Sequence, residues 1–234
     1  KNLSDTGQFL NTLQTTLPPD LFEVIIKLLP ASVFVKQIQE TPNLNKICNL
    51  LKDLHNVHYP SIQELSPNLF IEKINNSHDL EEISWFLSNL QITVSPSFFS
   101  EIIRMPTPYI ISKKIEKCNK LRDIGLLISY LDEIHYLYIT KFPPALFDSK
   151  IRMENNLRDI GMLLSTLKET CTRNSFMAIL HNLPVKVFIE KIKQGDNLQD
   201  IGILLATLHK IQYSDINKIP ISLYVSKIFV HLAS

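Results

Sequence analysis

Glycine is scarce in this sequence, which contains 5 glycines in 234 residues. Tight β-hairpin turns and phosphate-binding loops both depend on glycine, so the sequence favours neither a β-rich fold nor a nucleotide site. No apolar run approaches the roughly 18 residues that a membrane-spanning helix needs. The first residues show no secretory signal pattern and no initiating Met. We therefore expect a protein without a membrane partner, cut from a longer chain.

Cysteine is rarer still, and the 3 cysteines are Cys48, Cys118 and Cys171. An odd number of widely separated cysteines, each inside a predicted helix, does not suit a disulfide framework or a cysteine-rich metal site. The pattern favours a reducing compartment, and we expect a cytoplasmic protein.

Neither sign of charge dominates, because 24 Lys and Arg residues stand against 23 Asp and Glu residues and give a formal net charge of +1. This balance provides no general attraction to nucleic acid or to an anionic membrane. The hydrophobic content of 45% is that of a folded globular protein and excludes a disordered chain.

The motifs of common catalytic sites are also missing. The sequence contains no Walker loop, no Gly-x-Ser-x-Gly, no His-Glu-x-x-His, no Cys-x-x-Cys and no EF-hand loop. His55 and His58 lie one helical turn apart, but no third ligand accompanies them, which favours a surface or helix-end role. We therefore expect no enzyme, no cofactor, no metal and no small-molecule substrate.

What the sequence does contain is a repeat, an apolar segment of the type LRDIGMLLSTL that occurs six times. The first residues of the six copies are Leu3, Leu44, Leu80, Leu121, Leu157 and Leu198. Successive copies begin 41, 36, 41, 36 and 41 residues apart, so long and short repeats alternate in pairs of 41 + 36 = 77 residues. Repeats of this length are typical of solenoids, in which each unit buries its apolar face against its neighbours. The sequence predicts a single all-α domain over residues 1–234, a right-handed α-solenoid of six tandem repeats with two to three helices each.

Each repeat is predicted to begin with a helix whose apolar residues recur at helical spacing on one face. At the start of three of these helices, a capping side chain stands three residues before a carboxylate. The pairs are Asp79 and Glu82, Asn156 and Asp159, and Asn197 and Asp200. The fifth residue of the helix is always small: Gly7, Cys48, Ser84, Gly125, Gly161 or Gly202. A glycine within a helix costs about 1 kcal/mol relative to alanine, so the repeated choice predicts the close approach of a neighbouring helix.

The segment after the first helix differs between the two types of repeat. Long repeats carry a second helix, predicted to open at Asp20, Ser97 and Asn174. Short repeats carry one or two helical turns packed by an aromatic residue, at Tyr59, Tyr136 and Tyr213. A proline then precedes a last helix, in which an aromatic residue or Ile stands four positions before an Ile, so that both face the core. These pairs are Phe34/Ile38, Phe70/Ile74, Ile111/Ile115, Phe147/Ile151, Phe188/Ile192 and Tyr224/Ile228.

Two features indicate a surface for a partner. A lysine directly precedes the Ile in five of the last helices: Lys73, Lys114, Lys150, Lys191 and Lys227. Stacked repeats would align these lysines about 10 Å apart, as a ladder suited to phosphates or to an acidic protein surface. The alternative is a solvated helix edge neutralised by nearby carboxylates, which the balanced charge favours. Trp85, the only tryptophan, is either an interface anchor or a residue partly buried between repeats.

The segment from Leu69 to Leu90, LFIEKINNSHDLEEISWFLSNL, resembles the helical repeats attached to archaeal and bacterial STAND-type signalling NTPases. The resemblance extends over essentially the whole chain and implies a sensor or scaffold solenoid that recognises a target while separate NTPase and effector domains act. A weaker likeness, to organellar helical-repeat RNA binders, is opposed by the weak net charge. We therefore expect a non-enzymatic interaction module that binds a protein or peptide on its concave surface. The alternative is an RNA-binding repeat protein that uses the lysine ladder.

Overall fold

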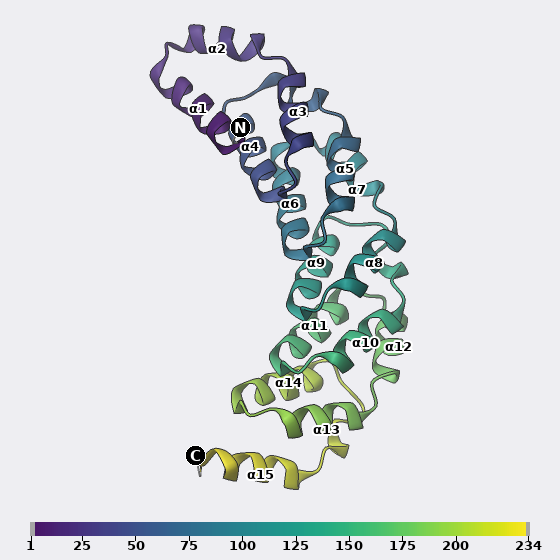
Figure 1. The fold of residues 1–234 in the computed structure, drawn as a ribbon. Coiled ribbons are helices and arrows are strands. Elements are labelled where there is room, and N and C mark those ends of the chain that lie inside the picture. The colour runs from purple at the N-terminus through teal and green to yellow at the C-terminus, as the bar shows by residue number, and fades with distance from the viewer. Residues whose placement is uncertain (1–2, 233–234) are drawn as a thin grey trace. The chain divides into compact units, whose positions relative to one another are not determined.

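Every regular element in the described part of the chain is helical (Figure 1). The computed structural model describes residues 3–232, apart from the side chains of Ser4 and Gln63. This range contains 15 α-helices, three short 3-10 helices and no strand, which confirms the all-α prediction. None of these helices is long and apolar enough to cross a membrane. The chain forms two compact units, residues 1–111 and residues 112–234.

In the first unit, the first helices of three successive repeats lie side by side. The unit contains α1 (Leu3–Thr16), α2 (Pro19–Leu28), α3 (Ala31–Glu40), α4 (Leu44–Asn56), the 3-10 helix η1 (Pro60–Glu64), α5 (Pro67–Asn76), α6 (Leu80–Thr93) and α7 (Pro96–Arg104). Helix α4 packs between α1 and α6, and α5 packs against α7 (Figure 1). Phe34, Phe70 and Phe86 are among the largest fully buried side chains between these helices.

The second unit repeats this arrangement. It contains η2 (Ile139–Lys141), η3 (Ile216–Lys218) and the helices α9 (Leu121–Glu133), α10 (Pro144–Met153), α11 (Leu157–Thr170), α12 (Arg173–His181), α13 (Val185–Gln194), α14 (Leu198–Lys210) and α15 (Ile221–Leu232). Helix α11 packs between α9 and α14, and α10 packs against α12. Helix α8 (Pro108–Lys117) contains the boundary between the two units.

The predicted helix caps are present. Asp79, Asn156 and Asn197 accept hydrogen bonds from backbone amides in the first turns of α6, α11 and α14. Asn43 caps α4 in the same way, because its side-chain oxygen accepts from the Lys46 amide at 2.9 Å. The sequence pattern missed this fourth cap because Lys46 occupies the position at which the other three helices carry a carboxylate.

The second helices of the long repeats begin earlier than predicted. The expected openers Asp20, Ser97 and Asn174 all lie inside α2, α7 and α12. Ser95 and Thr172 cap α7 and α12 instead, and each side chain accepts from an amide three residues later, at 3.4 and 3.2 Å. Each of these helices begins two residues sooner than predicted. Pro19 and Pro96 explain the early start of α2 and α7, because proline fits the first turn of a helix, and the Thr172 cap explains that of α12.

The short repeats carry 3-10 helices where one or two helical turns were expected. Tyr59, Tyr136 and Tyr213 are all buried beside them. The Tyr59 hydroxyl donates to the carbonyl of Leu29 at 2.8 Å, and the Tyr213 hydroxyl donates to the carbonyl of Leu183 at 2.7 Å. Each of these two hydroxyl groups therefore binds a carbonyl just after the second helix of the preceding long repeat. This contact explains why a tyrosine recurs at this position.

The helices α4, α9 and α14 end in the left-handed backbone region without using glycine. His58, His135 and Gln212 follow these helices with φ of 54°, 54° and 58°. In each case the next amide reaches back to a helical carbonyl, as Tyr213 does to Leu208 at 2.9 Å. This is the hydrogen bond of a Schellman turn, which satisfies the last carbonyls of a helix. His58 thus has the helix-end role that the sequence favours.

The small fifth position of the first helix permits close packing at two of the four glycines. A Cβ added at Gly161 would lie 3.1 Å from Thr207 Oγ1 on α14, and one added at Gly7 would lie 2.7 Å from Asp53 Cβ on α4. At Gly125 the nearest atom would be 3.9 Å away, and at Gly202 nothing lies within 4 Å. The predicted close approach is therefore confirmed for α1 and α11, and wrong for α9 and α14.

The three cysteines are free. Cys48 lies in α4 as predicted, whereas Cys118 follows α8 and Cys171 forms the C-cap of α11. The prediction that all three lie inside helices was wrong for the last two, because α8 and α11 end one residue before them.

Candidate functional site

The lysines of the predicted ladder are not a row of solvated charges. Lys114, Lys150 and Lys191 are buried, and Lys73 and Lys227 are half-buried. Burial lowers the pKa of Lys114, and nearby Lys117 lowers it further. Burial also lowers the pKa of Lys191, while Glu154 acts in the opposite direction. Both shifts reflect the cost of holding an ammonium group away from water.

Two hydrogen bonds to backbone carbonyls at the end of the preceding repeat's last helix are donated by each of Lys73, Lys150 and Lys227. The acceptors are Gln39 and Thr41 for Lys73, Glu116 and Cys118 for Lys150, and Lys193 and Gly195 for Lys227, at 2.6–2.8 Å. Lys191 instead donates to Asn155 Oδ1 at 3.2 Å. A positive charge at a helix C-terminus satisfies its last carbonyls and compensates the helix dipole. These lysines therefore join consecutive repeats, and a partner-binding role for them stays a prediction.

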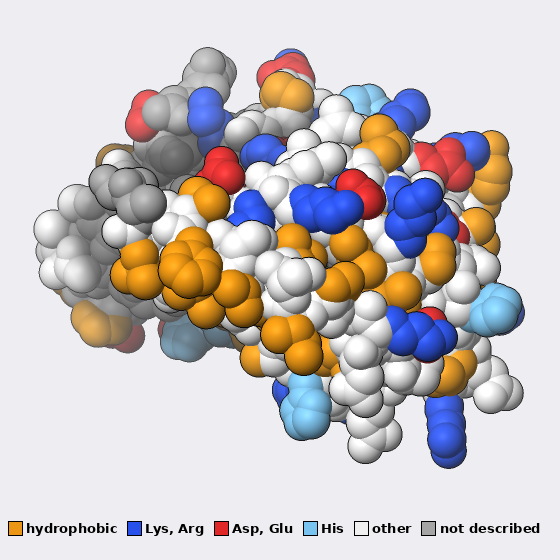
Figure 2. Space-filling model, turned by 90° about the horizontal axis from the view of Figure 1, so that it is seen from below, with side chains coloured by type: hydrophobic (Ala, Val, Ile, Leu, Met, Phe, Trp, Pro, Cys, Tyr) orange, Lys and Arg blue, Asp and Glu red, His pale blue; other side chains and the backbone are white. Residues whose placement is uncertain are grey.

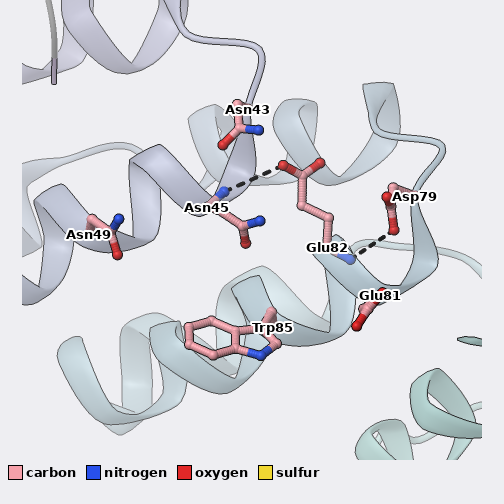
Figure 3. A pocket seen from close by; sticks show the side chains of 7 residues that line it. All are labelled: Asn43, Asn45, Asn49, Asp79, Glu81, Glu82 and Trp85. Atoms are coloured by element: carbon pink, nitrogen blue, oxygen red, sulfur yellow. Dashed lines mark hydrogen bonds between the residues drawn. The ribbon is translucent and has the colours of Figure 1, made fainter. Parts of the chain in front are cut away.

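A different surface, between α4 and α6 of the first unit, is hollowed. The hollow has a volume of about 540 Å³ and is lined by Asn43, Asn45, Asn49, Asp79, Glu81, Glu82 and Trp85 (Figure 3). Asn45 and Glu81 are the second residues of their helices, and Asn49 and Trp85 are the sixth. Residues four apart share one side of a helix, so both helices present these positions on their exposed side.

Two of the carboxylates in this hollow accept hydrogen bonds from backbone amides at the starts of α4 and α6. Glu82 Oε1 accepts hydrogen bonds from the backbone amides of Leu44 at 2.9 Å and of Asn45 at 3.5 Å, so a side chain of α6 caps the start of α4. Figure 3 shows the bond from Asn45. Asp79 in turn accepts from the Glu82 amide at 3.0 Å. The third carboxylate, Glu81, is exposed. Three carboxylates and no cationic residue line the hollow, so its field favours a positively charged ligand group.

Trp85 adds an aromatic surface beside these carboxylates. Its side chain is 54% exposed, although it stands in the same helix as the fully buried Phe86. The ammonium of Lys52 on α4 lies 5.1 Å from the centre of the indole ring, a cation–π arrangement. Trp85 is therefore partly covered by the neighbouring repeat, and part of its ring is still exposed to solvent. The position is compatible with both interpretations from the sequence, an interface anchor and a residue partly buried between repeats.

Sequence reasoning missed the hollow itself. Its amide residues carry no charge, and no motif links the start of α4 to the start of α6, which lie 36 residues apart in the chain. The sequence signal for the hollow is a pair of exposed positions, the second and the sixth residue of each first helix. These hold Asn45 and Asn49 in one repeat and Glu81 and Trp85 in the next.

Comparison with protein-family models, with curated proteins and with solved structures gives no match for this chain. Among the described residues, no group of three or more His, Cys, Asp or Glu side chains is placed to hold a metal ion.

Proposed function

We propose that this chain is a non-enzymatic interaction module, a sensor or scaffold that binds a protein or peptide partner. In this proposal its six repeats stack into a right-handed solenoid, and the partner lies along the exposed side of the first helices, which would be the concave surface. The observation that carries the proposal is the exposed Trp85 beside the acidic hollow between α4 and α6. The resemblance to the repeats of STAND-type proteins supports the same role.

The chemistry of the hollow points to a basic segment of the partner. An arginine or lysine side chain would find the Glu81 carboxylate, the amide oxygens of Asn45 and Asn49, and the face of Trp85 within one hollow. Guanidinium groups both stack on aromatic rings and bind carboxylates, and tryptophan is enriched among the residues that dominate binding energy at interfaces. Asp79 and Glu82 would contribute mainly through their field, because both already accept backbone hydrogen bonds.

The test uses the fact that Trp85 is the only tryptophan, so the intrinsic fluorescence of the protein reports on this hollow. We expect a short arginine-rich peptide to change that fluorescence saturably, and a glutamate-rich peptide of equal length to leave it unchanged. By calorimetry, Glu81→Gln and Trp85→Ala should each weaken binding of the arginine-rich peptide about tenfold, the loss of one charge contact or one aromatic anchor.

Ile92→Ala provides a matched control, since Ile92 is exposed near the other end of the same helix and does not line the hollow. It should bind the arginine-rich peptide as the unmodified chain does. Equal affinity for the arginine-rich and glutamate-rich peptides, or full affinity in both hollow variants, would contradict the proposal.

A further inference from the structure

A separate hollow, within the second unit, carries three cationic side chains. It lies beside α13, has a volume of about 390 Å³ and is lined by Arg152, Pro184, Lys186, Val187, Glu190, Lys191 and Gln194. Arg152 belongs to α10, and the other residues lie on α13 or directly before it. Glu190 is the one carboxylate among the described residues of this wall, and it pairs with Lys193 Nζ at 3.1 Å. The charge left in this α13 hollow is positive, which favours an anionic ligand group.

The feature that sets the α13 hollow apart is the buried ammonium group of Lys191. Lys191 is 8% exposed, and its side chain makes a single hydrogen bond to the described residues, with Asn155 Oδ1 at 3.2 Å. At the same place in their helices, Lys150 and Lys227 each donate to two backbone carbonyls. The Glu154 carboxylate acts on Lys191 through its field only, because it accepts two backbone amides at 2.8 Å. A buried charge with one neutral partner costs free energy, and an anion in the hollow would offset that cost.

The other two cations of the α13 hollow are not a product of the repeat. Their equivalents in the other repeats are Asn75 and Phe229 for Arg152, and Ser32 and Tyr109 for Lys186. Stacking of the repeats therefore does not require a cation at either position. Exposed cations alone do not define a site, since Lys and Arg side chains lie in several places on the face seen in Figure 2. The α13 hollow differs because two such cations line the same wall as a buried third.

All three cations have hydrogen-bond donors to spare. Arg152 donates one N–H of its guanidinium to the carbonyl of Asn182, which holds the group near the start of α13 and leaves other N–H donors of its five. Lys191 uses one of its three ammonium hydrogens in the bond described above. Lys186 is exposed and has no hydrogen bond or ion pair with the part of the chain that the structure describes. One ligand group in the hollow can therefore accept from all three.

We propose that the α13 hollow binds the phosphate group of a phosphorylated serine or threonine side chain on a partner protein. Such a phosphate carries a charge of about −1.5 to −2 and three acceptor oxygens, one for each cation. A carboxylate brings a single charge and two oxygens, so it satisfies the three cations less well. Arginine also binds phosphate through two parallel N–H···O hydrogen bonds.

The size of the α13 hollow supports a phosphorylated side chain over a free phosphate ion. Its volume of about 390 Å³ lies in the range of pockets that hold a whole small ligand, about 300–1,000 Å³. Pro184 and Val187 provide an apolar part of the wall for the rest of the phosphorylated residue. The α13 hollow and the hollow with Trp85 belong to different units and favour ligand groups of opposite charge, so either binding can be absent without affecting the other.

Calorimetry tests this site with a short peptide that carries one phosphoserine and no other charged side chain. We expect the phosphopeptide to bind, the same peptide with serine to show no measurable binding, and the version with glutamate to bind at least about tenfold more weakly. Inorganic phosphate should displace the phosphopeptide only in large excess, because it makes no contact with Pro184 and Val187. A phosphopeptide that does not bind, or that binds no more tightly than its serine or glutamate version or than inorganic phosphate, would overturn the proposal.

Two exposed side chains of the hollow allow a test that does not disturb the core. Arg152→Gln and Lys186→Met should each weaken phosphopeptide binding about tenfold, the loss of one charge-assisted contact, and circular dichroism checks that both variants are folded. Arg173→Gln is the matched control, because Arg173 is an exposed arginine on α12 that does not line the hollow, and it should bind as the unmodified chain does.

Full affinity in both hollow variants, or an equal loss in the control, would place the phosphopeptide elsewhere and overturn the proposal. So would single-stranded RNA that binds more tightly than the phosphopeptide and is weakened by the same two variants, because the hollow would then be part of a nucleic-acid site.

Discussion

At the scale of single residues, the lysines before the core Ile contribute more to folding stability than a surface charge normally does. Lys150 is buried and donates to two backbone carbonyls, those of Glu116 and Cys118. Removing the ammonium leaves both carbonyls without this donor, and a hydrogen bond to a charged group contributes about 1.5–3 kcal/mol.

We predict that Lys150→Met, which keeps most of the apolar stem, lowers the free energy of unfolding by about 1.5–3 kcal/mol. The urea midpoint measures this change. Lys186 on α13 is exposed, and Lys186→Met should stay within about 0.5 kcal/mol of the unmodified chain. Equal midpoints for the two variants would show that the carbonyl contacts of Lys150 do not stabilise the fold.

Cys48 gives a prediction for alkaline pH. Burial in α4 raises the pKa of its thiol from 9.0 to about 12, with Glu82 adding to the shift and Lys52 opposing it. Between these two values the unfolded chain has lost the thiol proton and the folded chain still holds it. Stability contributed by the neutral thiol is therefore complete below pH 9 and falls as pH rises above it, by about 1.4 kcal/mol per pH unit.

We predict that the unmodified chain loses more stability between pH 8 and about pH 10.5 than Cys48→Ala does, because alanine has no proton to lose. Urea unfolding at a series of pH values measures the difference between the two slopes. The comparison cancels the titration of other buried groups, including Tyr213, whose pKa burial raises to about 12. Parallel slopes would mean that Cys48 does not titrate differently in the two states.

At the scale of the elements, the left-handed residues that end α4, α9 and α14 are positions at which a substitution can stabilise the fold. Gln212 adopts φ of 58° at the end of α14 and is exposed, so its side chain gains little packing there. Glycine accepts this backbone region without the steric cost that a Cβ imposes.

We predict that Gln212→Gly raises the free energy of unfolding by about 1 kcal/mol. Gln212→Ala keeps the Cβ and should give no such gain. Thermal or urea unfolding of the two variants side by side measures the contribution of the backbone alone. A glycine variant no more stable than the alanine variant would show that the strain is relieved elsewhere.

Regular patterns made the elements predictable, and the places where prediction failed have local causes. The helical spacing of Leu and Ile, together with capping residues such as Asn156, predicts where the first helix of each repeat lies. The start of α7 does not, because Pro96 moves the cap to Ser95. The sequence also could not show that Lys73 reaches carbonyls 32 and 34 residues away, since that contact depends on how α5 packs beside α3.

The candidate site was predictable only in part. Trp85 stands out as the single tryptophan, and its exposure was one of the two readings open from sequence. The hollow beside it exists because α6 caps α4 through Glu82, which brings Asn45 and Glu81 onto one surface. A contact between side chain and backbone across repeats leaves no local signature in the sequence.

At the scale of the whole molecule, the balanced charge and the occupied lysines predict weak binding to nucleic acid. We expect single-stranded RNA to show no appreciable complex near physiological salt, because Lys73, Lys150 and Lys227 already bind carbonyls and charge screening limits the reach of others to about 8 Å. Filter retention over a range of salt concentrations measures this. A submicromolar, salt-sensitive complex weakened by changing Lys114, Lys150 and Lys191 to Ala would place the RNA-binding alternative first.

The lysine contacts also bear on how the chain loses its structure. The ammonium groups of Lys73, Lys150 and Lys227 each lie on one repeat and bind two carbonyls of the repeat before it, so part of the stability of these repeats depends on the neighbouring repeat. When a repeat that carries one of these lysines unfolds, the helix end before it loses two hydrogen-bond donors, so we expect neighbouring repeats within each unit to lose their structure together.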